Sequence, residues 1–227
     1  MDLINPTVRR WLAEAEKSHE TFWAKAAEES PWFRRWDRTF SWDFPNFKWF
    51  EGGLTNLAYN ALDHHVRHGR GGHAALVYVN ERGERRVYTY AQLLHEVEKA
   101  AAALRGMGIR KGDRITVYMP TSPEAIILML AAVRIGAIHV VVFAGFGARA
   151  LGDRIRASGS KLVFTTDITF RKGKEVNLKG IVDAALEGEP HSVEKVVVLA
   201  RTQAGKACGA RDVPWEEFLA MGAGQSG

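Results

Sequence analysis

Hydrophobic positions between residues 112 and 167 follow two alternating patterns. Three short runs rich in β-branched residues cover residues 115–119, 139–143 and 162–165. Apolar residues at helical spacing fill the two segments between these runs. The order strand, helix, strand, helix, strand predicts a parallel sheet flanked by helices, so the expected fold class is α/β. The run at 139–143 is apolar throughout, which predicts a strand buried on both faces.

The segments before this stretch predict helices, a wrapping segment and a small hairpin. Helical spacing extends over residues 8–29, and aromatic residues interleaved with charges over 32–49 predict an irregular strap docked on the core. Two strand-like runs at 74–79 and 86–88 flank a turn sequence and predict a hairpin. Thr89, with Gln92 three residues later, predicts the capping box of the next helix.

The segments after this stretch continue the alternation. A polar loop is expected at 168–177, a helix at 178–186 and a further strand at 193–200. We therefore divide the chain into a helix and aromatic strap (1–53), an α/β subdomain (54–200), and a final loop with a short helix (201–227).

Composition narrows the classes of function. Basic residues number 31 against 26 acidic ones and are scattered along the chain, so neither a nucleic-acid partner nor a membrane surface is predicted. The longest uncharged apolar run is too short to span a bilayer. One cysteine, Cys208, excludes an internal disulfide and fits a reducing, cytoplasmic setting. No spacing of histidines or carboxylates requires a catalytic or metal-binding role, so none is assigned.

The loop after the second strand of the sheet is the first candidate site. Gly145, Gly147 and Ala150 match G-x-G-x-x-A between a strand and a helix, and Asp167 ends the next strand. This context is typical of dinucleotide binding, with pyrophosphate at the helix amino terminus and ribose on the acidic residue. A tight turn without a ligand explains the glycines equally well.

A second interpretation of the same loop is a phosphate-rich ligand such as coenzyme A. Glycine lets backbone amides approach a ligand closely. The loop after the third strand brings Arg171, Lys172 and Lys174 to the same edge of the sheet. Amides and cations that converge on one edge suit a pyrophosphate and a 3′-phosphate.

Several long motifs resemble the amino-terminal part of the AMP-forming acyl-CoA synthetases, the adenylate-forming enzymes. They are WFEGGLTNLAYNALDHHV, TYAQLLHEV, KGDRITVYMPTSPEAIILMLAAVRIGAIHVVVFAGFGARALGDRI and FRKGKEVNLKGIVDAAL. The aromatic strap and the first motif are most similar to the acetyl-CoA and propionyl-CoA synthetase branch. The resemblance extends over nearly the entire chain.

The resemblance implies a ligase that uses ATP and Mg²⁺ to convert a short carboxylate, acetate or propionate, to an acyl-adenylate, and then transfers the acyl group to coenzyme A. It also implies that seven residues line the coenzyme A nucleotide site: Phe143, Ala144, Gly145, Arg171, Lys172, Gly173 and Lys174. Family members usually carry glycine where Ala144 stands, and arginine where Lys174 stands. The first change could crowd the ligand, and the second removes a bidentate donor.

The family's phosphate-binding loop, acyl pocket and carboxy-terminal catalytic lysine have no counterpart in these 227 residues. The expectation is therefore an amino-terminal fragment that cannot form the adenylate alone. The alternatives are a non-catalytic nucleotide- or CoA-binding module working with a separate partner chain, and an NAD-binding domain.

Overall fold

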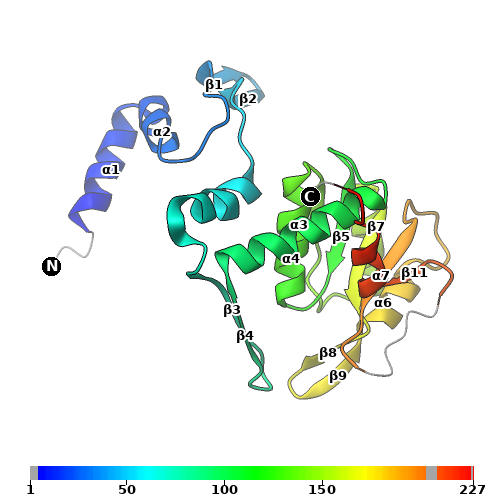
Figure 1. The fold of residues 1–227 in the computed structure, drawn as a ribbon. Helices are drawn as coiled ribbons and strands as arrows, with labels where there is room; N and C mark the ends of the chain where they lie inside the picture. Colours follow the sequence, from blue (N-terminus) through cyan, green and yellow to red (C-terminus); the bar gives the residue numbers. More distant parts are fainter. Residues whose placement is uncertain (1–4, 203–208, 226) are drawn as a thin grey trace. The chain divides into compact units, whose positions relative to one another are not determined.

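The computed structural model describes residues 5–202, 209–225 and 227 (Figure 1). The chain forms two compact units, residues 1–64 and 65–227, whereas the sequence placed the first division after residue 53. The docking of the amino-terminal segment on the core stays a prediction. Cys208 lies outside the described residues.

The first unit begins with two helices, α1 (Pro6–Lys17) and α2 (His19–Ala27). The prediction of one continuous helix over residues 8–29 is wrong at Ser18. This residue is extended, with φ −163°, and its hydroxyl accepts a hydrogen bond from the Thr21 amide at 3.2 Å. Serine competes for backbone donors in this way, so it starts a new helix and ends the previous one.

The aromatic segment is also more regular than predicted. Strands β1 (Arg38–Asp43) and β2 (Asn46–Glu51) form an antiparallel hairpin. Pro45 lies in the turn, where its missing N–H removes no ladder bond. Aromatic rings pack across the hairpin, with the Phe40 and Trp49 centroids 4.5 Å apart. The unit ends with a π-helical turn, η1 (Tyr59–Asp63), in which Leu62 is buried.

The second unit is built on a five-stranded parallel sheet with the order β11-β10-β7-β5-β6. The strands are β5 (Arg114–Tyr118), β6 (Ile138–Val141), β7 (Leu162–Thr166), β10 (Lys195–Leu199) and β11 (Asp212–Pro214). The predicted βαβαβ order and the α/β class are confirmed. The central residues of strands β5 and β7, Ile115–Val117 and Leu162–Phe164, are fully buried.

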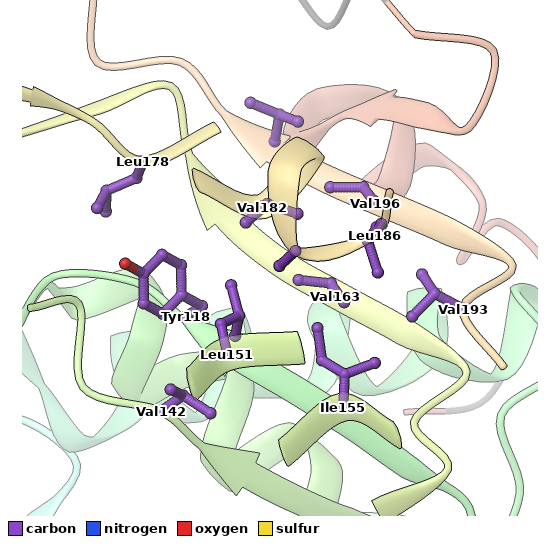
Figure 2. Close-up of a cluster of buried hydrophobic side chains, with 12 residues drawn as sticks. Tyr118, Val142, Leu151, Ile155, Val163, Leu178, Val182, Leu186, Val193 and Val196 are labelled. Atoms are coloured by element: carbon purple, nitrogen blue, oxygen red, sulfur yellow. The ribbon is translucent and has the colours of Figure 1, made fainter. Parts of the chain in front are cut away.

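Helices cover both faces of this sheet. On one face, α5 (Ala148–Ser158) and α6 (Leu178–Ala185) supply Leu151, Ile155 and Val182 to a buried cluster with Val163 of β7 (Figure 2). On the other face lie α4 (Pro123–Arg134) and α7 (Trp215–Ala220), and α3 (Tyr90–Gly106) packs against both helices.

Two hairpins extend toward the lower part of the view in Figure 1. The predicted hairpin β3 (Ala74–Val79) and β4 (Arg85–Thr89) is confirmed, and so is the capping box of Thr89 that starts α3. A short turn, η2 (Val66–Arg70), precedes it. Residues 168–177 form a second hairpin, β8 (Ile168–Arg171) and β9 (Lys174–Asn177), where the sequence predicted a polar loop.

The prediction that residues 139–143 form a strand buried on both faces is wrong. Among the described strands, β6 pairs with β5 alone and forms an edge of the sheet. Ile138 is 51% exposed and Val141 56% exposed. An apolar sequence pattern shows that a strand can be buried, but its place in the sheet depends on which other strands pair with it.

None of the helices in the described part of the chain has the length and apolar character that a membrane span requires.

Candidate functional site

The carboxyl edge of the parallel sheet brings together the two loops singled out in the sequence. The Arg171 guanidinium carbon lies 6.0 Å from the centre of the Phe143 ring. A β-carbon built on Gly145 would lie 3.0 Å from Arg171 Nη1 and would overlap the Phe143 ring. The hairpin after β7 and the loop after β6 therefore meet at Gly145, as the sequence predicted for Arg171.

The loop after β6 is a tight turn that is hydrogen-bonded to a buried side chain of the sheet. The Phe146 amide donates to the Phe143 carbonyl at 3.0 Å. The Phe146 carbonyl accepts a hydrogen bond of 2.6 Å from the Tyr118 hydroxyl at the end of β5. Burial raises the pKa of this phenol, which keeps it protonated and able to donate. The buried tyrosine thus fixes the position of the loop relative to the sheet.

Two phenylalanine rings present an aromatic surface at this edge. Phe143 is 64% exposed, and its ring meets Phe146 edge to face at 6.0 Å. The Arg154 guanidinium carbon lies 4.6 Å from the centre of the Phe146 ring, and Arg154 also donates to the Ala150 carbonyl at 2.8 Å. The rings are therefore flanked by two arginines, Arg154 and Arg171, from separate elements.

Ala144, the residue that the sequence marked as a possible obstruction, faces the core. It is half-buried and packs against the hydrophobic cluster that contains Leu151 and Val142. Its methyl group therefore contributes to packing between β6 and α5.

The basic residues of the second loop lie around a two-residue turn. Lys172 and Gly173 both have positive φ, 51° and 74°, the geometry that joins tightly paired antiparallel strands. Arg171 and Lys174 are directly opposed across this turn, and all four residues are exposed. Of the cations Arg171, Lys172 and Lys174, only Arg171 contacts the loop after β6 among the described residues.

Asp167 has a structural role at the same edge. It is buried, and its Oδ1 accepts from the amides of Ile168 and Arg201 at 2.8 and 2.7 Å. Its Oδ2 accepts from the amide and hydroxyl of Thr202 at 3.1 and 2.8 Å. These bonds tie the segment after β10 to the end of β7. Both oxygens are engaged, which counts against the ribose-binding role required by the NAD interpretation.

Sequence reasoning missed Tyr118 as a support of the site. Its position in an apolar strand run shows only that it is buried. The hydroxyl's partner is a backbone carbonyl 28 residues later, and no local pattern indicates such a pairing.

Two family models match the chain. The model described as AMP-binding enzyme covers residues 62–217. The chain belongs to this family. A second model, Acetyl-coenzyme A synthetase N-terminus, covers residues 8–61. Together they confirm the resemblance seen in the motifs.

Individual relatives agree. An acetyl-coenzyme A synthetase of Rubrobacter xylanophilus is 46% identical over 208 residues, which are 91% of this chain and 32% of that protein. A 3-hydroxypropionyl-coenzyme A synthetase of Sulfurisphaera tokodaii is 48% identical over 187 residues, 81% of this chain and 28% of that protein. The chain thus spans about a third of the length of these relatives.

A solved structure gives the same result for the fold. The acetoacetyl-CoA synthetase of Streptomyces lividans matches with a TM-score of 0.78 and 27% identity, over 93% of this chain and 35% of that one. The fold of this chain therefore matches about a third of an acyl-CoA synthetase structure.

Proposed function

We propose that this chain supplies part of the coenzyme A site of a short-chain acyl-CoA synthetase. The observation that carries the proposal is the contact of Arg171 with Gly145 and Phe143 at the carboxyl edge of the sheet. A side chain at position 145 would fill the space in which backbone and guanidinium meet, which explains a glycine there.

The residues present fit the chemistry of coenzyme A. The exposed Phe143 ring offers a face for an adenine base. Arg171, Lys172 and Lys174 offer positive charges for the phosphates of coenzyme A. The amino terminus of α5, which favours negative charge, directly follows the loop after β6. Lys174 provides one ammonium group, so it contributes charge without a bidentate grip. Ala144 packs inward, which supports its compatibility with a ligand.

The full reaction requires more than this chain holds. In the complete synthetase, ATP with Mg²⁺ would convert acetate or propionate to the acyl-adenylate with release of pyrophosphate, and the thiol of coenzyme A would then displace AMP to give the acyl-CoA. The chain's own residues would bind and orient the nucleotide end of coenzyme A. We propose that residues 1–227 alone lack ligase activity and work in the cytoplasm with a carboxy-terminal portion or a partner chain.

Calorimetric titration of coenzyme A tests the binding proposal. Arg171→Ala is expected to weaken binding about tenfold or more, the effect of losing one charge-assisted contact. Lys195→Ala is the matched control. Lys195 is the first residue of β10 and therefore lies at the amino-terminal ends of the parallel strands, away from the site. This variant should leave the affinity for coenzyme A unchanged. Equal affinities for the wild type and both variants would refute the site. Binding of NADH in preference to coenzyme A would favour the dinucleotide interpretation.

Acetate-dependent exchange of pyrophosphate into ATP tests the expected lack of activity. The isolated chain should show no exchange above a sample without protein. Measurable exchange that depends on acetate would show that these residues form the adenylate themselves. Coenzyme A binding without exchange is also what a non-catalytic binding module would give, and restoration of activity by a supplied carboxy-terminal portion distinguishes the synthetase fragment from it.

A further inference from the structure

The hairpin β8–β9, which carries Arg171, has little support from backbone pairing. In the described part of the chain, its two strands pair only with each other. A two-stranded hairpin is marginally stable by itself in water. The base of this hairpin is fixed, because Ile168 and Thr169 are each only 8% exposed, whereas residues 171–175 are all exposed. The position of Arg171 therefore depends on the side-chain contacts that hold the far end of the hairpin.

Phe170 makes such contacts. Because side chains alternate along a strand, its half-buried ring lies on the face of the hairpin opposite to Arg171. The guanidinium carbon of Arg82 lies 4.8 Å from the centre of the ring, and that of Arg201 lies 6.0 Å from it. Cations at this range are attracted to an aromatic ring. The Arg201 backbone is fixed in turn, since its amide donates to the buried Asp167 at 2.7 Å.

The turn that carries Arg82 is also held in place. The side-chain oxygen of Asn80 accepts hydrogen bonds from the amides of Arg82 and Glu84, both at 3.0 Å. The same hairpin, β3–β4, is anchored to α4, because Arg86 donates to both carboxylate oxygens of Glu124 at 2.6 and 3.3 Å. Contacts therefore run from the helix layer through one hairpin to the ring on the other.

We propose that Phe170 is a positioning residue for coenzyme A. Held by Arg82 and Arg201, its ring keeps the hairpin β8–β9 in one position. Arg171, on the opposite face, then stays against Gly145 before the ligand arrives. A side chain that already occupies its bound position loses less conformational freedom on binding, which raises the affinity. This role rests on the proposed coenzyme A site, and it assigns a function to residues that act through Arg171.

The NMR signal of the Arg171 side-chain Nε–H group tests the positioning without any ligand. The guanidinium carbon lies 6.0 Å from the centre of the Phe143 ring, and an aromatic ring shifts the signals of protons near it. Phe170→Leu and Arg82→Gln should each move this signal toward that of an unstructured arginine. Phe170→Tyr, which keeps the ring, should leave it close to the wild type. Arg85→Gln is the matched control, an exposed arginine at the start of β4, and it should leave the signal unchanged.

Calorimetric titration of coenzyme A tests the consequence for binding. Phe170→Leu and Arg82→Gln should each weaken binding by roughly threefold to tenfold, the effect of ordering one more long side chain on binding. Both variants should act through Arg171, so neither should weaken binding further in a chain that already carries Arg171→Ala. A general loss of structure would instead lower the affinity by the same factor with or without Arg171. Arg82 is exposed, so Arg82→Gln should fold even if Phe170→Leu does not.

The outcomes separate this proposal from that of the coenzyme A site. An unchanged Arg171 signal in Phe170→Leu and Arg82→Gln would overturn the positioning role, even where Arg171→Ala weakens binding and the site itself stands. Equal weakening in the presence and absence of Arg171 would also overturn it. A wild-type chain that does not bind coenzyme A, with the Arg171 signal displaced in both variants, would refute the site and reduce Phe170 to a contact that stabilises the hairpin.

Discussion

At the scale of single residues, Tyr118 shows how a core side chain can define a surface loop. Its ring is buried in the cluster between the sheet and α5, and its hydroxyl reaches the Phe146 carbonyl at 2.6 Å. Tyr118→Phe keeps the ring and removes this bond. We expect a loss of about 1 kcal/mol in the free energy of unfolding and weaker coenzyme A binding, measured by urea unfolding and calorimetry. Unchanged values of both quantities would contradict the proposed support.

His139 gives the molecule a pH-dependent term. Burial lowers the pKa of its imidazole below the ordinary 6.5, and its Nδ1 is buried without a hydrogen-bond partner among the described residues. The unfolded chain therefore binds a proton more readily than the folded chain. The stability due to neutral His139 is present above pH 6.5 and is lost as the pH falls through the lowered pKa.

His139→Phe should therefore flatten the decline of stability in the range just below pH 6.5. The measurement is the melting temperature against pH for both proteins. Asp113 provides an internal reference. The hydrogen bond from Lys161 lowers the pKa of its carboxyl group below 3.8, so its contribution disappears only in stronger acid. The same slope between pH 6.5 and 5 in both proteins would exclude His139 as the source.

At the scale of elements, α5 and α6 approach closely at a glycine. A β-carbon on Gly152 would lie 2.9 Å from the Ala185 carbonyl oxygen. Gly152→Ala should lower the free energy of unfolding by about 1–2 kcal/mol through overpacking, even though alanine is the better helix former. Gly147→Ala adds the same methyl group to open space at the N-cap of α5, and because glycine is preferred over alanine at an N-cap it should cost up to about 1 kcal/mol, less than Gly152→Ala. Denaturant titration gives the free energy of unfolding of both variants. Equal losses for Gly152→Ala and Gly147→Ala would contradict the close approach of α5 and α6.

The predictability of each element depended on how local its determinants are. The order of β5, α4, β6, α5 and β7 followed from hydrophobic period and caps, which are properties of neighbouring residues. Ser18 as a helix boundary and residues 168–177 as a hairpin were missed although they are local features, because turn chemistry over two or three residues leaves no mark on the hydrophobic period. The edge position of β6 was missed because it depends on which strands are present.

At the scale of the whole molecule, several large apolar side chains are exposed to solvent. In the second unit, Ile138, Val141, Phe143 and Val79 are each more than half exposed. The chain matches about a third of the length of its relatives. The loops of the candidate site were found from the sequence, since parallel strands share a carboxyl edge. The contact of Arg171 with Gly145 required the structure.

The most direct test of the account is chemical-shift mapping of the chain titrated with coenzyme A and with dephospho-coenzyme A, which lacks the 3′-phosphate. We expect coenzyme A to shift the amides of Phe143, Gly145, Phe146, Arg171 and Lys174, and dephospho-coenzyme A to bind more weakly at the same residues. Shifts confined to other parts of the chain, with these five amides unchanged at saturation, would contradict the proposed site.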